Sequence, residues 1–193
     1  MRLQEIDTGD TLGSRLLIRF ISTVSGMRLP DAARVAFYHK DFLGGVLGPW
    51  TQATMRGPSS WSVGERELMA AMTAKWNSCA FCVGAHRATS ARSLTREVVD
   101  AALSDYRTAP LPAPLIAMLG FLEKLTRTPD EVTSADARLV LAAGVTQDAM
   151  ADAVAVTTLF AIVTRYADAL QFAMPTEAEF DKAADMLLKR GYA

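Results

Sequence analysis

The stretch Glu67-Leu-Met-Ala-Ala-Met-Thr-Ala-Lys-Trp-Asn-Ser-Cys79-Ala-Phe-Cys82-Val-Gly-Ala-His86 is the most informative part of this sequence of 193 residues. It contains both cysteines, one of the two histidines and one carboxylate in a mostly apolar helical segment. Thiols three residues apart can close a disulfide at the start of a helix. His86 follows Cys82 by four residues and therefore lies one turn further along the same helical face. The stretch predicts thiol redox chemistry.

Composition and periodicity favour an all-α fold. Half of the residues are hydrophobic, only 8% are aromatic, and alanine is abundant. Such a composition suits closely packed helices better than a sheet, which is rich in β-branched and aromatic residues. Apolar residues recur with helical periodicity in Thr11–Val24, and strand patterns are essentially absent.

Capping signals place two helices around the cysteines. The sequence Ser-Val-Gly-Glu at 62–65 matches a capping box, so a helix is expected from there to about Trp76. Ser78 follows as an N-cap, and a second helix is expected over 79–92. Further helices are expected at 11–24, 31–43 (ended by Gly44-Gly45), 95–103, 115–125, 134–144, 147–172 and 176–190, and 46–60 is expected to be an irregular connection with a short helix inside.

Charge and hydropathy exclude some classes of partner. Positive and negative side chains nearly cancel, 20 against 21, and no basic patch stands out, so nucleic acid is not an expected partner. No signal peptide is readable, and the longest apolar stretch, near Ala153–Val163, is well short of a membrane span. We therefore expect a cytoplasmic protein without a membrane partner, whose CxxC pair forms a reversible disulfide.

The candidate site residues are Glu67, Cys79, Cys82 and His86. With Ser78 as N-cap, both thiols lie near the positive end of a helix, which stabilises thiolates. Glu67 shares its helical face with alanines that allow another helix to approach closely, so we expect it to be partly buried and to need a partner such as an imidazole. The break between the two helices lets Glu67 approach His86, and a relay from Glu67 through His86 to Cys82 is predicted.

Each of these residues also has an ordinary structural interpretation. A CxxC pair can bind zinc, but zinc normally needs four ligands and His39 is the only other soft candidate, so a complete metal site is not expected. His86 alone could be a hydrogen-bonded structural histidine, and Glu67 alone a solvated helix residue. His39 lies in an amphipathic segment and is expected to have a structural or surface role.

The pattern Glu-x11-Cys-x2-Cys-x3-His that these four residues form resembles that of the AhpD-like alkylhydroperoxidase group of the carboxymuconolactone decarboxylase family. The local sequence at 64–68 and 77–86 resembles the peroxidase-related branch of that family. The segments 121–129 and 158–170 are similar to its downstream helices. The resemblance implies one AhpD-like helical bundle, 1–193, with N-terminal helices in 1–56, a core at about 57–174 and a C-terminal helix in 175–193.

The same resemblance implies a homo-oligomeric peroxidase that works without haem, flavin or metal. Cys82 would attack the O–O bond of a hydroperoxide and become a sulfenic acid. Cys79, nearer the helix end and more exposed, would condense with it to a disulfide and accept electrons from a thiol or dithiol, such as a lipoylated or thioredoxin-like protein. His86 and Glu67 would relay protons. The helix-end argument alone favours Cys79 as the more acidic thiol.

Phe81 departs from the family pattern, because the best-studied members carry a histidine between the cysteines. Phenylalanine cannot pass a proton, so the relay is expected to be shorter or water-mediated. Three functions are compatible with these residues: a thiol peroxidase or disulfide reductase of antioxidant defence, a lactone decarboxylase with the same fold, and a non-catalytic redox sensor. The cysteine pair argues against the decarboxylase, since that reaction needs acid–base groups and no dithiol, whereas Phe81 favours the sensor.

Overall fold

The computed structural model describes residues 3–38 and 40–192, and this part of the chain is all-helical, as the sequence predicts. It contains α-helices, one π-helix (η1) and one short 3-10 helix (η2). The elements are α1 Gln4–Thr8, α2 Leu12–Ser25, α3 Asp31–Phe37, η1 Lys40–Leu47, α4 Gly48–Arg56, α5 Val63–Trp76, α6 Ala80–Leu94, α7 Arg96–Asp105, α8 Ala113–Arg127, η2 Pro129–Glu131, α9 Ser134–Ala142, α10 Gln147–Ala169 and α11 Glu177–Arg190.

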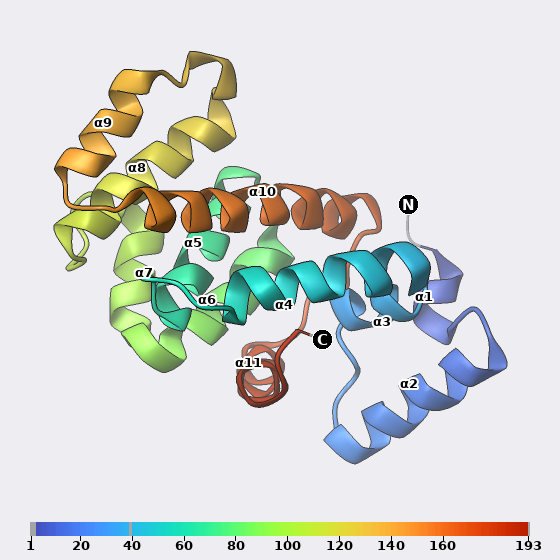
Figure 1. Ribbon diagram of the computed structural model, residues 1–193. Coiled ribbons are helices and arrows are strands. Elements are labelled where there is room, and N and C mark those ends of the chain that lie inside the picture. The colour runs from blue at the N-terminus through green and yellow to red at the C-terminus, as the bar shows by residue number, and fades with distance from the viewer. Residues whose placement is uncertain (1–2, 39, 193) are drawn as a thin grey trace.

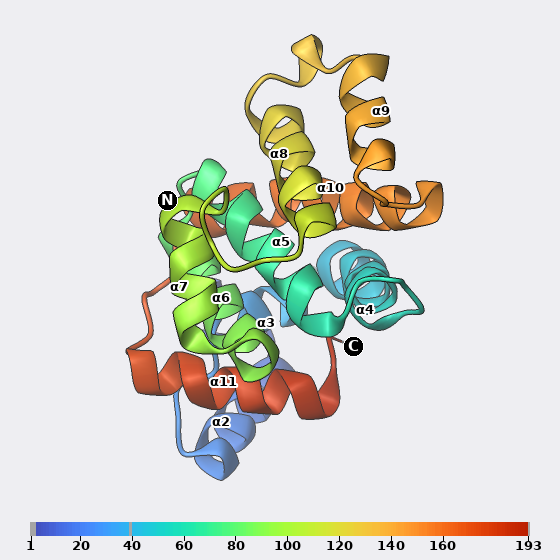
Figure 2. The ribbon, with the colours of Figure 1, turned by 90° about the vertical axis from the view of Figure 1, so that its left-hand side faces the viewer.

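The hairpin of α5 and α6 forms the centre of the molecule. α10 crosses α5 on one side, and α11 lies along α6 on another (Figures 1 and 2). α8 and α9 form a second hairpin that extends away from the bundle, as Figure 2 shows. The helices α1, α2 and α3 lie at the opposite end, and η1 continues directly into α4. The central hairpin thus carries the stretch that contains the candidate site.

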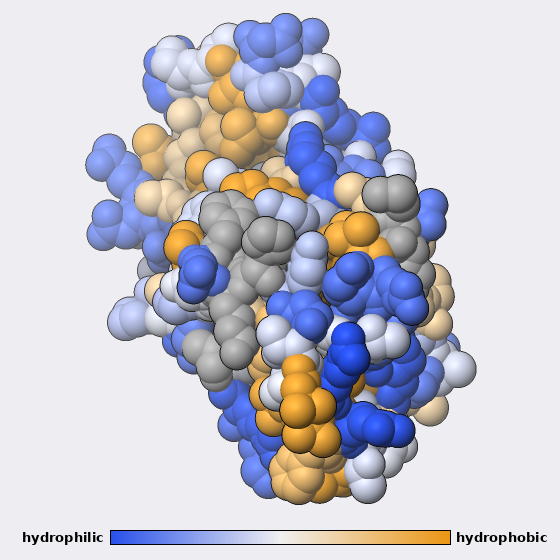
Figure 3. Space-filling view, turned by 90° about the vertical axis from the view of Figure 1, so that its right-hand side faces the viewer, coloured by the Kyte–Doolittle hydropathy of each residue, from blue (hydrophilic) through white to orange (hydrophobic). Residues whose placement is uncertain are grey.

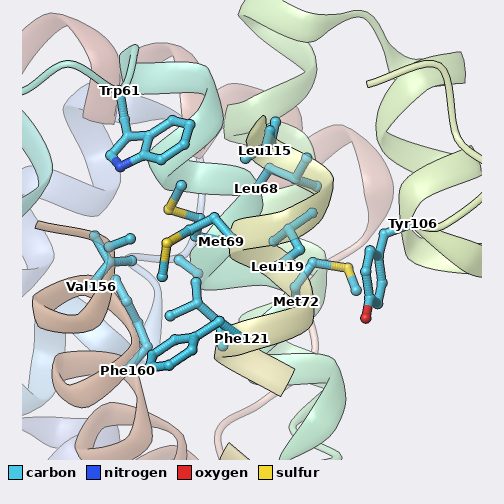
Figure 4. Close-up of a cluster of buried hydrophobic side chains, with 14 of the residues drawn as sticks. Trp61, Leu68, Met69, Met72, Tyr106, Leu115, Leu119, Phe121, Val156 and Phe160 are labelled. Atoms are coloured by element: carbon cyan, nitrogen blue, oxygen red, sulfur yellow. The ribbon is translucent and has the colours of Figure 1, made fainter. Parts of the chain in front are cut away.

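The main hydrophobic core lies between α5, α8 and α10. Figure 4 shows part of it, with Leu68 and Met69 from α5, Leu119 from α8 and Phe160 from α10. Trp61 closes this core and donates its indole N–H to the carbonyl oxygen of Ala149 at 2.7 Å, so its polar atom is satisfied although the residue is buried.

α10 is a helix of this core, although its composition also fits a membrane span. By length and hydropathy it is, within residues 3–38 and 40–192, the one helix that could cross a membrane. Its side chains Ala153, Val156 and Leu159 are completely buried against the rest of the bundle. Packing of this kind is typical of the central helix of a helical bundle.

Side-chain caps set several helix ends where the sequence predicts them. Ser62 forms the expected capping box at the start of α5, and Thr146 caps α10. Thr176 forms a further capping box at α11. The cap of α9 is Thr133 and not the expected Ser134, because its side chain bonds with Asp136 three residues on.

The structure corrects the prediction that Ser78 is the N-cap of α6. Ser78 has a φ of 62° and ends α5, with its N–H donating to the carbonyl of Lys75 at 3.0 Å. The N–H of Cys79 donates to the carbonyl of Ala74 at 2.9 Å, which completes a Schellman motif. Cys79 is therefore both the last residue of that motif and the N-cap of α6, and Cys82 is the third residue of the helix.

The expected helix at 31–43 is also wrong in detail, whereas the short helix expected inside the connection at 46–60 is present as α4. α3 ends at Phe37, and the chain is helical again from Lys40 to Arg56. Gly44 does not stop a helix but lies within η1, where a Cβ atom would stand 2.8 Å from the carbonyl oxygen of Ala36. The glycine is thus needed for the close approach of η1 to α3, a reason that the sequence pattern does not show.

α2 leaves an apolar face in solvent. Figure 3 shows this face as an apolar strip at the lower end of the molecule. A strip of large apolar side chains on one helix is unusual for the surface of a monomer. Its members, which we call the α2 strip, are Leu12, Leu16, Leu17, Phe20 and Val24, between 42% and 73% exposed.

Candidate functional site

The central feature of the site is a buried contact between Glu67 of α5 and His86 of α6. The Schellman turn at Cys79 reverses the chain, so that α6 packs back along α5. As a result, Nδ1 of His86 lies 2.6 Å from Oε2 of Glu67. Glu67 is completely buried and His86 is 6% exposed. The approach of Glu67 to an imidazole, expected from its alanine-rich face, is thus present.

The imidazole is held on its other side by α10. The rings of His86 and Phe160 meet edge to face, with their centroids 4.3 Å apart. This contact fixes the plane of the imidazole against an apolar wall, while the carboxylate fixes its Nδ1 atom.

Two residues that the sequence analysis missed complete the surroundings of Glu67. Nη2 of Arg56 donates to Oε1 at 2.7 Å, and the hydroxyl of Tyr192 donates to Oε1 at 3.0 Å and to Oε2 at 3.2 Å. Burial by itself would raise the pKa of Glu67, but the hydrogen bond and charge of His86, together with the Arg56 guanidinium, outweigh it and lower that pKa. Glu67 is therefore a carboxylate at neutral pH.

The thiol pair is enclosed. Cys79 is completely buried and Cys82 is 3% exposed, so the expectation that Cys79 is the more exposed thiol is wrong. The residues around them are apolar and come from α5, α6, α10 and α11. The reason is the Schellman turn, which draws Cys79 inward against Ala74.

The expectation that the helix end lowers both thiol pKa values is wrong for Cys82. Its thiol is hydrogen-bonded to Cys79 and buried, and it lies near Cys79 and Asp168, all of which raise its pKa. In the reduced protein Cys82 therefore keeps its proton at neutral pH and needs a base in order to react. The partial positive charge of the helix end does not overcome burial here.

The structure joins Glu67 and His86 by a hydrogen bond but does not join His86 and Cys82 in this way. The described side chains of His86 and Cys82 make no direct hydrogen bond, although both belong to one face of α6. A proton that passes between them must cross a water molecule or follow a small movement of the helix.

Phe81 belongs to an aromatic cluster that covers the thiols. Its ring meets that of Phe172 at 5.1 Å between centroids, and that of Phe180 at 5.9 Å. Phe172 follows α10 and Phe180 belongs to α11, so the cluster joins three parts of the chain. The position between the cysteines is thus an apolar packing site in this protein.

α11 packs against α6 through one close contact and a row of ion pairs. A Cβ atom at Gly84 would lie 2.6 Å from the ring of Phe180, so the glycine permits the close approach of the two helices. Arginines of α6 and α7 bind carboxylates of α11 along the edge of this contact. This row, which we call the arginine ladder, pairs Arg87, Arg92 and Arg96 with Glu177, Asp181 and Asp185.

A hollow of about 520 Å³ opens at the same contact between α6 and α11. Ser78, Val83, Gly84 and Phe180 are among its walls. Neither cysteine is among the residues that line the hollow, and both are buried.

The described residues contain no group of three or more histidine, cysteine, aspartate or glutamate side chains that could hold a metal ion. His39, the additional ligand considered from the sequence, lies outside the described residues. Arg56 and Tyr192 carried no sequence signal, because they reach Glu67 from 11 and 125 residues away.

Comparison with known proteins links this arrangement to a known fold. No protein-family model and no curated protein matches the sequence. Among solved structures, the chain is similar to an uncharacterized peroxidase-related protein from Silicibacter sp. TM1040, with a TM-score of 0.74 and 27% identity over 88% of this chain and 87% of that one. It is also similar to the alkylhydroperoxidase AhpD core of an uncharacterized peroxidase-related protein from Ralstonia eutropha JMP134, with a TM-score of 0.73 and 26% identity over 88% and 87% of the two chains.

The debrominase Bmp8 has the same fold, with a TM-score of 0.70 over 94% of this chain and 96% of that one, at 15% identity. An identity of 15% supports a shared fold and no more. The resemblance inferred from the cysteine motif is confirmed: the chain has an AhpD-like fold and matches AhpD-core, peroxidase-related proteins.

Proposed function

We propose that this AhpD-like protein is a cofactor-independent thiol peroxidase of the alkyl hydroperoxide reductase type. The observation that supports the proposal most is the 2.6 Å contact between His86 and Glu67, made by the helix that begins at the CxxC pair. A buried carboxylate that orients an imidazole near a thiol is an arrangement suited to activating that thiol as a nucleophile. The similarity to peroxidase-related proteins adds support.

Glu67 sets the tautomer of a neutral imidazole at His86. An ionised carboxylate only accepts hydrogen bonds, so the Nδ1 atom of His86 carries the proton and donates it to Oε2 of Glu67. Nε2 is then the free lone pair of the ring and can accept a proton from Cys82, through a water molecule. The raised pKa of Cys82 makes such a base necessary.

In the proposed cycle, the Cys82 thiolate attacks one oxygen of a hydroperoxide ROOH and the O–O bond breaks. The alkoxide takes the proton held by His86 and leaves as the alcohol, and Cys82 becomes a sulfenic acid. Cys79, after losing its own proton, attacks that sulfur, the S–O bond breaks, and the hydroxide takes up the proton and leaves as water. Two thiols are thereby oxidised to one disulfide, and an external dithiol reduces it again.

The surroundings of the thiols suggest the class of substrate and partner. They are lined by alanine and phenylalanine side chains, which favours an organic hydroperoxide over hydrogen peroxide. The reductant is proposed to be a thiol or dithiol, such as a lipoylated or thioredoxin-like protein, in a cytoplasmic setting. A homo-oligomer is proposed as well, since the α2 strip is a large apolar surface for a monomer to leave in water.

Counting thiols against peroxide tests the function. The reduced protein should lose both thiols for one equivalent of an organic hydroperoxide, and a dithiol should restore them. Cys79→Ser should consume one equivalent and stop at a sulfenic acid on Cys82, whereas Cys82→Ser should consume none. A sulfenic acid on Cys79 in Cys82→Ser would reverse the two roles, and two thiols persisting beside intact peroxide would contradict the proposal.

A redox sensor is the second candidate, because both thiols are enclosed and Phe81 replaces a proton-carrying residue. A change of oligomer size between reduced and oxidised protein, without repeated turnover, would favour the sensor. Activity on a lactone that survives replacement of both cysteines by serine would favour a decarboxylase.

A further inference from the structure

The carboxylate of Glu67 is saturated by donors from three separate parts of the chain. α6 supplies His86, α4 supplies Arg56, and the segment after α11 supplies Tyr192. Of these three donors, Tyr192 contacts both carboxylate oxygens: its hydroxyl lies 3.0 Å from Oε1 and 3.2 Å from Oε2. A donor that bridges the two oxygens restricts rotation of the carboxylate about its terminal bond.

The end of the chain is built to hold that hydroxyl in place. Gly191 has a φ of 80°, a conformation that residues with a Cβ atom rarely adopt, and a Cβ atom there would lie 2.5 Å from the side chain of Gln52. The N–H of Tyr192 donates to Oε1 of Gln52 at 2.7 Å, and the Arg56 guanidinium lies over its ring at 4.8 Å. The backbone, the ring and the hydroxyl are therefore each fixed by a different partner.

We propose that Tyr192 is a positioning residue of the thiol site, which holds the Glu67 carboxylate toward His86 and keeps it from taking up the proton of the relay. The inference rests on the proposed function, in which His86 is the base for Cys82. A hydrogen bond to the ionised form of an acid favours that form, so the Tyr192 hydroxyl lowers the proton affinity of Glu67. It also contacts Oε2, the oxygen that faces His86, and so fixes the direction from which that oxygen accepts the Nδ1 proton.

The other charged groups around this cluster do not replace Tyr192. Arg66 precedes Glu67 in the chain, but its Nη1 atom donates to the carbonyls of Thr54 and Gly57. From α10 the side chain that faces His86 is Phe160, which carries no charge. Burial and the charge of Glu67 raise the pKa of Tyr192 well above its usual value, so the phenol remains a donor through the neutral and mildly alkaline range.

The test compares Tyr192→Phe with wild type and with Tyr106→Phe in the full-length protein. Tyr106 is a matched control, because its hydroxyl donates to Oε2 of Glu123 at 2.8 Å, away from the site. We measure, at neutral pH, the NMR signal of the imidazole Nδ1–H proton that donates to Glu67, identified by its loss in His86→Ala. In Tyr192→Phe this signal should change its position, because the carboxylate that accepts the Nδ1 proton loses one donor and its fixed orientation. Tyr106→Phe should leave it unchanged.

A second readout is the pH profile of thiol oxidation by the hydroperoxide. Its acid limb should move to higher pH in Tyr192→Phe, because the Glu67 carboxylate then loses a hydrogen bond that favours its ionised form and takes up a proton more readily. Gly191→Ala, which displaces the chain end while keeping the tyrosine, should move it in the same direction. The imidazole signal does not depend on turnover, so inactive wild-type protein would refute only the peroxidase proposal. An unchanged signal in folded Tyr192→Phe would refute the positioning role.

Discussion

Glu67 and His86 stand 19 residues apart in the sequence, yet the carboxylate and the imidazole meet at 2.6 Å. The turn that ends α5 at Ser78 and starts α6 at Cys79 is responsible, because it brings α6 back along α5. The same turn buries Cys79. The thiol pair and its acid–base partners therefore depend on one local structure, and the following predictions address its parts.

Removing the acid–base pair should slow peroxide consumption without preventing it. His86→Ala is expected to lower the rate of thiol oxidation by about 10²–10⁴-fold, the usual contribution of a general base. Glu67→Gln should lower it less, because the imidazole remains but is no longer held by a charge. Glu65→Gln is the control, since Glu65 belongs to the same helix but only closes its capping box. Wild-type rates in both variants would remove the pair from the mechanism.

Glu67 should make the stability of the protein depend on pH in the acid range. Its pKa is lower in the folded than in the unfolded protein, so the stability it provides is present above pH 4.5, its ordinary pKa, and is lost as the pH falls through the folded value. The difference in free energy of unfolding between wild type and Glu67→Gln should be constant near neutral pH and shrink below about pH 4.5. Urea unfolding at several pH values measures it, and a constant difference down to acid pH would contradict it.

The contact between Gly84 and Phe180 should control access to the thiols. Gly84→Ala forces the Phe180 ring away, with an expected loss of about 1–3 kcal/mol in the free energy of unfolding. The thiols should also react faster with a water-soluble disulfide reagent. Gly13→Ala is the control, because the nearest atom to its Cβ would be 4.0 Å away. Equal thiol reactivity in the two variants would show that α11 does not shield the cysteines.

Restoring a histidine between the cysteines should not restore a relay. Phe81 is surrounded by Phe172 and Phe180, so Phe81→His places an imidazole where it has no hydrogen-bonding partner. A cost of about 1–3 kcal/mol in folding stability and no gain in peroxide consumption are expected. Phe20→His serves as control, since Phe20 is 66% exposed and its replacement should change stability by less than about 0.5 kcal/mol. Faster turnover in Phe81→His would show that the position still opens to the relay.

The sequence predicts those features of the fold and the site that depend on neighbouring residues, such as helix caps. The caps at Ser62, Thr146 and Thr176 sit next to the backbone groups they bind, so short motifs were enough to place them. The burial of Glu67 is also predictable from the sequence, because the neighbouring residues on the same helical face are alanines. The N-cap of α6 was not, since Ser78 has the composition of a cap but takes a left-handed conformation that closes α5 instead.

The rest of the site depends on contacts over long distances in the chain. Tyr192 and Arg56 bind Glu67 from different elements, and a single residue that arrives from elsewhere leaves no periodic or spaced pattern. The sequence wrongly predicts a lowered pKa for the Cys82 thiol for a similar reason. The helix end is visible in the sequence, whereas the apolar cover supplied by α11 is a product of the whole fold.

The arginine ladder gives the cover over the thiols a sensitivity to ionic strength. Its pairs stand at the protein edge, with the Arg92 side chain 28% and its partner Asp185 65% exposed, so dissolved ions reach them. At 1 M salt the Debye length falls to about 3 Å, and exposed pairs lose most of their attraction. The apolar contact of Phe180 with α6 is not weakened in this way. We therefore expect α11 to hinge about its apolar contact in concentrated salt, so that the salinity of the surroundings sets how readily the cysteines meet an oxidant.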